Sequence, residues 1–316
     1  MPNVLRWGRS AYETDLDLGL ERRDAEELGL AWTHEPALHQ PAQLESADIL
    51  VVNSGVCVDA EVLDRLYGSL VITTTSGTDH IDIAAASERG IDVCRCPEAR
   101  RDAVVDTTLA GILGLLRELP RLHGAATRGD WARGRLPTLG PVLLQERTVA
   151  VLGAHGVIGR VVCSKLSALG AKVLPVDPRG TPDAPTVPLT EAVALADVLT
   201  IHCLLTDQTR GMIDGPVLDA LGPQGVVINT ARGPILDVAS AASRVARGQL
   251  RGILVDVFPT EPYPKLAVEA AIEGVWFTPH AAGYTPSLGA RVAAGVRRIL
   301  KAYIEHSELP YTVTAG

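Results

Sequence analysis

The stretch Val149-Ala-Val-Leu-Gly153-Ala-His155-Gly156-Val157-Ile158-Gly159-Arg decides the fold of this chain. Its first four residues are apolar and predict a buried strand, and its three glycines predict a tight turn into a helix. Such a turn presents backbone N–H groups at a helix N-terminus, where a pyrophosphate can bind. A second predicted strand, Lys172–Asp177, ends in a carboxylate about where a ribose-binding acid is expected. The stretch therefore predicts a mononucleotide-binding βαβ unit.

The spacing of these glycines departs from the usual dinucleotide-binding pattern. Gly153, Gly156 and Gly159 form G-x-x-G-x-x-G, which is one residue longer than G-x-G-x-x-G. A tight αβ turn that binds nothing is therefore the alternative interpretation. The complete order of strand, glycines, helix, strand and acid favours binding over this alternative. His155 lies within the turn, where it either points to solvent or touches a phosphate.

Composition limits the classes of protein that this chain can represent. Its 316 residues exceed the size of a typical single core, so two domains are expected. The hydrophobic content of 47% and the charged content of 21% are those of an ordinary globular protein. A net charge of −8 without a basic block argues against nucleic acid or an anionic membrane as a partner. No apolar run approaches the length of a membrane span, and no signal peptide is recognisable.

The five cysteines are an odd number and show no C-x-x-C spacing. Cys94 and Cys96 are too close together for that motif and have no matching pair elsewhere, so we predict no metal site. Free thiols are typical of a reducing compartment, and we expect a cytoplasmic protein.

Strands and helices alternate along most of the chain, which predicts parallel sheets with helices on both faces. The further predicted strands span residues 48–52, 69–74, 90–94, 198–202, 226–229, 253–257 and 275–277. The predicted helices span residues 22–28, 60–67, 83–89, 103–119 (ending at Pro120), 213–221, 238–247 and 285–306, with mostly loop over 128–144. The predicted fold class is α/β with two doubly wound parallel-sheet domains. A cofactor domain of residues 101–284 is inserted into a substrate domain of residues 1–100 and 285–316.

Three side chains that follow predicted strands could carry chemistry: Arg232, Glu261 and His280. The carboxyl ends of parallel strands meet at one edge of a sheet, so these residues are expected to converge there. An arginine fork can hold the carboxylate and polarise the carbonyl of a 2-keto acid, and a histidine can supply the proton as hydride arrives at carbon. A carboxylate beside the histidine would orient its ring and favour its protonated form.

Each of the three has a plainer interpretation when it is taken alone. Arg232 would be a loop arginine in a solvent ion pair, Glu261 an acid in a turn, and His280 a satisfied histidine at a strand end. Asp256 lies inside an apolar predicted strand, and its carboxylate must be paired or hydrogen-bonded because burial of a lone charge is costly.

Four segments together resemble the D-isomer-specific 2-hydroxyacid dehydrogenase family. They are Ser76-Gly-Thr-Asp79-His-Ile-Asp82, Ile228-Asn-Thr-Ala-Arg232-Gly-Pro-Ile-Leu-Asp237, Asp256-Val-Phe-Pro-Thr-Glu261-Pro262 and Thr278-Pro-His280-Ala-Ala-Gly283-Tyr-Thr285. The resemblance covers roughly residues 48–306 in the family's order. It implies a Rossmann-type cofactor domain inserted into a flavodoxin-like substrate domain. It also implies NAD as the cofactor and hydride transfer between NAD(H) and a D-2-hydroxy acid/2-keto acid pair.

The resemblance implies roles for individual residues. Arg232, Glu261 and His280 would be catalytic, with His280 as the acid/base, Glu261 as its partner and Arg232 as the substrate clamp. The implied substrate-binding residues are Ser76, Gly77, Thr78, Arg232 and His280. The implied cofactor-binding residues are Gly153, His155, Gly156, Val157, Ile158, Asp177, Pro178, His202, Thr230, Ala231 and Asp256, the last of them contacting the nicotinamide carboxamide.

The choice between NAD and NADP depends on the acid at the end of the second strand. Asp177 would bind the adenosine ribose, and a carboxylate there repels a 2′-phosphate, which favours NAD. Arg179, two residues on, weakens that preference unless it is a solvated turn arginine. The family is usually dimeric, and residues 103–144 are the candidate surface of a homodimer.

The chain departs from the family's pattern in its longer glycine turn and at three further places. His80 stands where the family usually has asparagine, Asp106 where it usually has glutamate, and Leu204-Leu205 where it often has a proline. None of these positions touches the implied catalytic residues. The departures therefore bear on cofactor geometry and substrate identity, and leave the reaction class as it is.

The identity of the substrate and two other functions remain open. Asn53 stands where phosphoglycerate-type members carry a basic residue, which argues against a phosphorylated substrate, although Arg100 and Arg101 could reverse this. One alternative function is a dinucleotide-sensing binding protein similar to the family's corepressor branch. The other is a phosphite dehydrogenase, which uses the same framework on an inorganic oxyanion.

Overall fold

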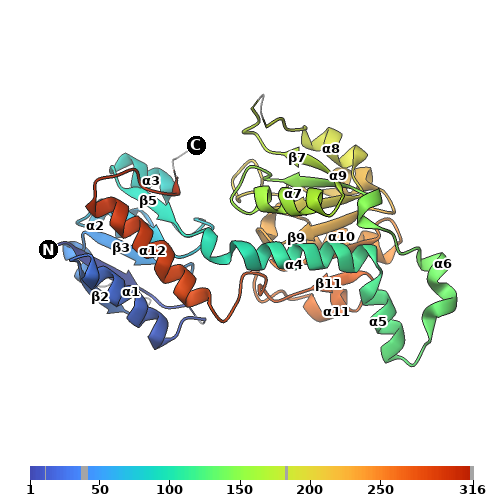
Figure 1. Cartoon of the computed structure of the whole chain (residues 1–316), viewed down its shortest axis with the longest axis horizontal. Coiled ribbons are helices and arrows are strands. Elements are labelled where there is room, and N and C mark those ends of the chain that lie inside the picture. The colour runs from blue at the N-terminus through green and yellow to red at the C-terminus, as the bar shows by residue number, and fades with distance from the viewer. Residues whose placement is uncertain (11, 37–41, 182–183, 314–316) are drawn as a thin grey trace. The chain divides into compact units, whose positions relative to one another are not determined.

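The computed structural model describes residues 1–10, 12–36, 42–181 and 184–313, and the chain divides into two compact units (Figure 1). Unit 1 consists of Met1–Arg101 and Tyr284–Gly316, and unit 2 consists of Asp102–Gly283. Unit 2 therefore interrupts unit 1 in the sequence. The boundaries predicted from the sequence are 100/101 and 284/285.

Unit 1 contains a six-stranded sheet in the order β12-β5-β4-β3-β1-β2. Its strands are β1 (Asn3–Trp7), β2 (Ala31–Glu35), β3 (Ile49–Val52), β4 (Leu70–Thr73), β5 (Asp92–Arg95) and β12 (Thr312–Val313). The first five run parallel to their neighbours, and β12 pairs antiparallel with β5. Read from β2 to β5, the sheet has the 2-1-3-4-5 strand order of flavodoxin-like folds.

Helices cover both faces of the unit 1 sheet. They are α1 (Asp15–Glu27), α2 (Ala60–Arg65), α3 (Ile83–Glu88) and α12 (Leu288–Ile304), with a 3-10 turn at Ala42–Ser46. Successive strand residues point to opposite faces: Ile49 packs with α1 and α12, whereas Leu50 packs with α2 and α3. Figure 1 shows α1 and α12 lying side by side. Burial on both faces explains why these strands read as continuous apolar runs.

Unit 2 contains a parallel six-stranded sheet in the order β11-β10-β9-β8-β6-β7. Its strands are β6 (Thr148–Leu152), β7 (Lys172–Val176), β8 (Val198–Ile201), β9 (Val226–Asn229), β10 (Gly252–Val255) and β11 (Val275–Phe277). The chain enters at β6, adds β7 on one side and then crosses to add β8 on the other. This reversal creates a topological switch point at the carboxyl end of β6, where open α/β sheets bind ligands.

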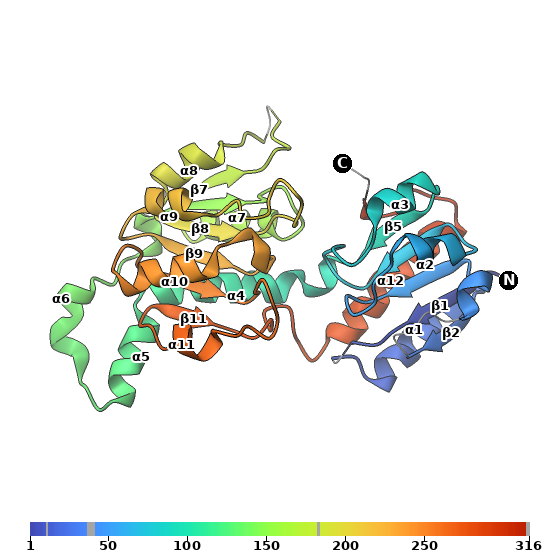
Figure 2. The same cartoon turned by 180° about the vertical axis from the view of Figure 1, so that it is seen from behind.

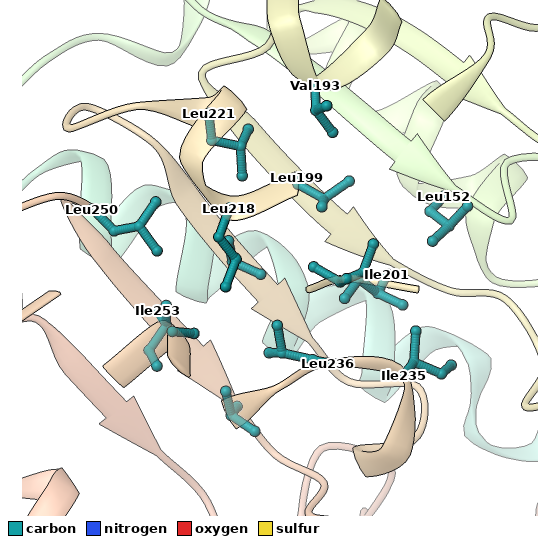
Figure 3. Close-up of a cluster of buried hydrophobic side chains, with 14 of the residues drawn as sticks. Leu152, Val193, Leu199, Ile201, Leu218, Leu221, Ile235, Leu236, Leu250 and Ile253 are labelled. Atoms are coloured by element: carbon teal, nitrogen blue, oxygen red, sulfur yellow. The ribbon is translucent and has the colours of Figure 1, made fainter. Parts of the chain in front are cut away.

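Helices also cover both faces of the unit 2 sheet. They are α4 (Glu98–Leu116, which begins in unit 1), α5 (Leu119–Thr127), α6 (Leu136–Leu139), α7 (Gly159–Ala168), α8 (Leu189–Leu195), α9 (Gly215–Leu221), α10 (Val238–Ala246) and α11 (Leu266–Ala270). One face packs against α4 and α7, and the other against α8, α9 and α10 (Figure 2). Figure 3 shows the core on the face covered by α8, α9 and α10, where Leu199 and Ile253 of the strands pack with Leu218 of α9. The predicted fold class, two doubly wound parallel-sheet domains, is confirmed.

Several predicted element boundaries are wrong in detail. The helix expected to end at Pro120 ends at Leu116, and Pro120 instead lies in the first turn of α5, where its missing N–H costs nothing. The last helix is shorter than residues 285–306. The predicted loop over 128–144 includes α6 and short 3-10 turns. Strands β1, β2 and β12 and helices α5, α8 and α11 were not predicted.

Candidate active site

Two of the three glycines in the β6–α7 turn are required by the backbone around them. Gly153 has φ of +82°, and a Cβ atom there would lie 2.6 Å from the amide nitrogen of Cys203. A Cβ on Gly159 would lie 2.1 Å from the carbonyl oxygen of Gly153. A Cβ on Gly156 would meet nothing nearer than that same oxygen, at 3.1 Å. Gly156 is therefore the least crowded of the three, and the absence of a side chain there lets a pyrophosphate approach the backbone closely.

Helix α7 begins directly after this turn without a side-chain cap. Ile158 occupies its N-cap position and makes no capping hydrogen bond, and Val157 precedes it in the turn. The first N–H groups of a helix carry partial positive charge and need partners. The N-terminus of α7 thus fits an anionic group beside Gly156, and this one-residue-longer turn retains that feature.

His155, within the glycine turn, has one ring nitrogen that is buried. Its amide donates to Asp177 Oδ2 at 3.0 Å, and its ring Nε2 is buried with no hydrogen-bond partner among the described residues. The residue as a whole is partly exposed, but this ring nitrogen does not contact solvent. A buried polar atom without a partner costs free energy, so this nitrogen is suited to a bound ligand's oxygen.

Asp177 follows β7 and its carboxylate is buried. Besides the His155 amide, it accepts the amide of Arg179 at 3.0 Å and the Arg179 Nε and Nη2 at 2.8 and 2.9 Å. Burial alone would raise the pKa of Asp177, but these hydrogen bonds outweigh it and lower that pKa to about 2. The carboxylate is therefore ionised at neutral pH. Pro178, between the two residues, is exposed.

His202 follows β8 at the edge of the same turn. Its Nε2 lies 2.8 Å from Thr200 Oγ1, and its Nδ1 is buried without a partner among the described residues. Burial lowers the pKa of His202 to about 3, so the ring is neutral at physiological pH. The carbonyl of His202 also packs against Gly153. A second unpartnered ring nitrogen thus lies beside the glycine turn, which fits the predicted dinucleotide site.

The structure brings His280 and Glu261 together. Nδ1 of His280 lies 2.7 Å from Glu261 Oε2, and Glu261 Oε1 accepts the amide of Phe258 at 2.9 Å. Both side chains are exposed, at 51% and 39%. His280 has φ of +54°, an uncommon conformation for a non-glycine residue that clusters at functional sites. The pair thus combines solvent access with a fixed geometry.

Asp256 holds the turn that carries His280. Its buried carboxylate accepts Thr278 Oγ1 at 2.6 Å and the amides of Ala281 and Ala282 at 2.8 and 3.0 Å. Its carbonyl accepts the amide of His280 at 2.8 Å. The prediction that this carboxylate must be hydrogen-bonded is therefore confirmed. Three bonds from one turn fix the backbone on which the imidazole is mounted.

Arg232 lies on the loop after β9, next to the segment that carries Glu261. Asn229 holds this loop, because its side chain donates to the Arg232 carbonyl at 3.0 Å and accepts the amide of Ala231 at 3.1 Å. A Cβ on Gly233 would lie 1.9 Å from the carbonyl carbon of Phe258, so the two segments are in close contact. The Arg232 Nη1 donates to the Ala231 carbonyl at 2.8 Å.

A shared sheet edge explains why these scattered residues lie on neighbouring loops. The register places Asn229, Val255 and Phe277 side by side at the ends of β9, β10 and β11. Arg232, Asp256 and His280 follow these three strands in turn. Thr230 adds a buried contact in which its Oγ1 lies 3.2 Å from Thr108 Oγ1 on α4.

The loop Ser76–Thr78 lies in unit 1 after β4. Arg95 donates to the Ser76 carbonyl at 3.0 Å, and Thr75 Oγ1 donates to the Gly77 carbonyl at 2.8 Å. The carbonyl of Thr78 accepts a turn hydrogen bond at 2.9 Å. These bonds hold the carbonyl oxygens, and thereby fix the orientation of the peptide units.

Sequence reasoning missed several supporting residues. Thr278 and Asn229 were not singled out, although each hydrogen-bonds the backbone or side chain of a site residue. Polar side chains at the last positions of apolar strands were the available signal. Of the departures from the family's pattern, His80 Nε2 lies 3.1 Å from Thr73 Oγ1, and Asp106 pairs with Lys165 at 3.1 Å.

The residues that the structure describes contain neither a cluster of metal-binding side chains nor a membrane-spanning helix. These residues include no group of three or more histidine, cysteine or acidic side chains able to hold a metal ion. Among them, no helix combines the length and the apolar composition that a membrane span requires. All five cysteines are free thiols; Cys94 and Cys96 are buried, whereas Cys57 is exposed.

Residues 109–282 match the model of the NAD binding domain of the D-isomer specific 2-hydroxyacid dehydrogenases. This chain belongs to that family. The glyoxylate/hydroxypyruvate reductase HPR3 of Arabidopsis thaliana is 30% identical over 273 residues, covering 85% of this chain and 84% of the relative. The match identifies unit 2 as the NAD-binding domain, in agreement with the glycine turn and the uncapped α7.

Other relatives are longer than the chain. The D-3-phosphoglycerate dehydrogenase of Methanocaldococcus jannaschii is 29% identical over 294 residues, which cover 89% of this chain and 55% of that protein. The chain thus spans about half the length of several relatives that it matches. Among solved structures, a D-lactate dehydrogenase from Aquifex aeolicus, complexed with NAD and lactic acid, superposes with a TM-score of 0.80. It is 25% identical, and the match covers 96% of each chain.

Proposed function

We propose that this chain is an NAD-linked dehydrogenase that interconverts a D-2-hydroxy acid and its 2-keto acid. The observation that carries the proposal is the 2.7 Å contact between His280 Nδ1 and Glu261 Oε2. It lies at the same sheet edge as the glycine turn of the NAD-binding domain. A histidine oriented by a carboxylate, on a rigid turn beside an arginine loop, is suited to proton transfer at a carbonyl oxygen.

His280 acts as the acid and base. Because Nδ1 faces Glu261, the other ring nitrogen, Nε2, donates a proton to the carbonyl oxygen during reduction and accepts it back during oxidation. NAD supplies or accepts the hydride at the neighbouring carbon when it is bound. Glu261 stabilises the imidazolium and keeps the ring in one orientation, because its second oxygen is held by the Phe258 amide.

Arg232 binds the substrate carboxylate, since a guanidinium fork matches the two oxygens. The amides of the loop Ser76–Thr78 are the second anchor that we propose for this carboxylate. Asp256 already accepts three hydrogen bonds and retains one acceptor position on Oδ2, to which the nicotinamide carboxamide can donate.

The proposed cofactor contacts follow the sheet edge from one side to the other. Gly153, His155, Gly156, Val157 and Ile158 hold the pyrophosphate, Asp177 and Pro178 the adenosine ribose, and His202, Thr230 and Ala231 the remainder towards the nicotinamide. The uncapped α7 and the two unpartnered ring nitrogens support this assignment.

The substrate that we propose is a small unphosphorylated 2-keto acid. Asn53 is buried and its Oδ1 accepts the Gly55 amide at 2.7 Å, so this position supplies no cation for a phosphate. Relatives of both kinds match the chain, with names that specify hydroxypyruvate and phosphoglycerate.

We further propose that the chain works as a cytoplasmic homodimer that forms through residues 103–144. Four large apolar side chains in that segment are exposed: Leu113 at 38%, Leu119 at 53%, Trp131 at 86% and Leu143 at 45%. Exposed apolar side chains of this size are typical of protein interfaces. The free thiols suit a reducing compartment. Light scattering of the purified chain measures the oligomeric state.

The decisive experiment compares the wild-type chain with His280→Ala. Glyoxylate, pyruvate and hydroxypyruvate are each offered with NADH, and phosphite is offered with NAD. We expect the wild type to reduce at least one keto acid, and His280→Ala to lower kcat by at least about 100-fold, the usual value of a general acid. NADH affinity, measured by fluorescence titration, should stay within about twofold, because His280 serves the chemical step.

His306→Asn, which removes an exposed histidine outside residues 103–144, is the matched control and should leave kcat unchanged. Tight NADH binding without turnover on any keto acid would instead support a dinucleotide sensor. Oxidation of phosphite would support a phosphite dehydrogenase. Equal keto-acid turnover by wild type and His280→Ala would remove the basis of the proposal.

A further inference from the structure

The carboxylate of Asp177 is fully occupied by its own chain. Oδ1 accepts the Arg179 amide at 3.0 Å and Arg179 Nε at 2.8 Å, while Oδ2 accepts the His155 amide at 3.0 Å and Arg179 Nη2 at 2.9 Å. A carboxylate offers about four acceptor positions. A ribose diol that donates to this group must therefore replace a partner that is already present.

We propose that Arg179 is a displaceable partner of Asp177 that weakens binding of NAD and allows the site to bind the 2′-phosphorylated dinucleotide as well. The inference rests on the proposed function only in taking Asp177 as the residue that meets the adenosine ribose. According to this inference, one exposed arginine determines the relative affinity of the site for NAD and for its 2′-phosphate. The reaction at the other end of the dinucleotide is not part of it.

Two of the four hydrogen bonds can be exchanged and two cannot. The amides of His155 and Arg179 belong to the main chain, and they stay in place whatever the side chains do. The side chain of Arg179, which carries the guanidinium, is 62% exposed, whereas the side chain of Asp177 is 1% exposed. The arginine can therefore rotate into water while the carboxylate remains fixed. Two ribose hydroxyls would then take the acceptor positions that Nε and Nη2 leave.

The charge of the pair determines how the site receives a 2′-phosphate. A lone carboxylate repels this dianion, which is the usual basis for NAD preference. Here the guanidinium neutralises the carboxylate at a distance of 2.8 Å. Once it turns away from Asp177, the same fork can bind the phosphate through two parallel N–H···O bonds. The pair thus raises the dissociation constant for NAD and lowers the dissociation constant for its 2′-phosphate.

Fluorescence titration of the full chain with NADH and with NADPH tests this directly. In Arg179→Ala, the dissociation constant for NADH should fall about threefold, because no guanidinium has to be displaced. The constant for NADPH should rise about tenfold, because the phosphate loses its charge-assisted partner while Asp177 still repels it. Asp177→Asn should shift both constants in the opposite directions. In 0.5 M NaCl the dissociation constants of wild type and Arg179→Ala for NADPH should differ less than they do at low salt.

Arg244→Ala is the matched control, because Arg244 also pairs with an aspartate, Asp219, on the distant helices α9 and α10. It should leave both constants unchanged. If Arg179→Ala leaves the ratio of the two constants as in the wild type, or if the wild type binds NADH and shows no NADPH binding, the inference is wrong. Failure of the proposed function is a separate result: both nucleotides bind, Arg179→Ala shifts the ratio, and no keto acid is reduced.

Discussion

Two carboxylates at the same sheet edge of unit 2 are held in opposite ways. Asp256, directly after β10, is 1% exposed and accepts three hydrogen bonds, from the Thr278 hydroxyl and from two amides of the turn that follows β11. Asp177, directly after β7, is 6% exposed and shares its oxygens between two amides and the side chain of Arg179. Both are buried and fully or almost fully hydrogen-bonded.

The two carboxylates differ in how easily their hydrogen-bond donors can be displaced. The partners of Asp256 belong to a turn of the main chain and one short hydroxyl, so they leave only if the turn itself unfolds. The guanidinium of Arg179 leaves by rotation about single bonds in a side chain that is mostly exposed. Burial of a carboxylate is therefore not a sufficient guide to its role. Asp256 fixes the backbone of His280, whereas we propose that Asp177 exchanges partners with a ligand.

The largest effect that we expect comes from Asp256→Asn. The asparagine has the same shape, but its NH2 group replaces an acceptor and faces an amide N–H of the 278–282 turn. We expect the free energy of unfolding to fall by about 2–4 kcal/mol, because a buried donor then lacks a partner. Keto-acid turnover should fall by at least about 100-fold, because His280 loses its fixed position. Urea unfolding and NADH oxidation measure the two quantities.

Asp219→Asn serves as its control, since this exposed carboxylate also has a hydrogen-bonded partner, Arg244. Its cost should stay below about 1 kcal/mol, as for other exposed ion pairs. An Asp256→Asn protein that matches the wild type in both stability and turnover would show that the turn stands without the carboxylate. The role assigned to Asp256 in the comparison of the two aspartates would then be wrong.

The sequence predicted the strands that end at this edge because their burial on both faces leaves continuous apolar runs. The predicted strands at 226–229 and 275–277 coincide with β9 and β11. The pairing of His280 with Glu261 was predictable because each follows such a run and parallel strands end together. The order of strands was not, since nothing in the local pattern shows that the chain crosses from β7 over β6 to β8.

The contacts of Arg179 and the unequal roles of the glycines were also beyond the sequence. Spacing placed Arg179 near Asp177, but the choice between a solvated arginine and a bidentate partner depends on side-chain rotamers. Gly153, Gly156 and Gly159 look alike in the motif, yet only the first and the last are forced by backbone that approaches within 2.6 Å. Such distances depend on elements that are distant in sequence.

His202 allows a second prediction, because it follows β8, between the strands of the two aspartates in the sheet. Burial lowers its pKa to about 3, whereas a histidine in an unfolded chain has a pKa of about 6.5. Between these values the unfolded chain binds a proton that the folded chain does not, so stability falls as the pH falls. We expect this group to remove about 2 kcal/mol between pH 6.5 and pH 5.

Urea unfolding of wild type and His202→Asn at several pH values isolates that contribution. The variant should lose less stability on acidification than the wild type does, by about 2 kcal/mol. His306→Asn, at an exposed position outside the proposed dimer surface, should follow the wild-type curve. Parallel curves for wild type and His202→Asn would show that solvent reaches the His202 ring and that the ring can be protonated in the folded chain.

The smallest effect that we predict, from Thr278→Val, sharpens the comparison most. The valine removes the hydroxyl that donates to Asp256 at 2.6 Å but leaves both amide donors in place, so we expect a loss of about 1 kcal/mol in stability. The turn loosens without unfolding, and kcat should fall about threefold to tenfold while NADH affinity is unchanged. Thr278→Ser, which retains the hydroxyl, should restore most of the turnover.

Removal of the Arg179 side chain should have the opposite effect: it should change nucleotide affinity and leave kcat unchanged. Both variants remove a hydrogen bond to a buried carboxylate, so opposite effects on kcat and on nucleotide affinity must come from different roles of the two carboxylates. If Thr278→Val changed NADH affinity and left kcat unchanged, the roles assigned to Asp256 and Asp177 would have to be exchanged.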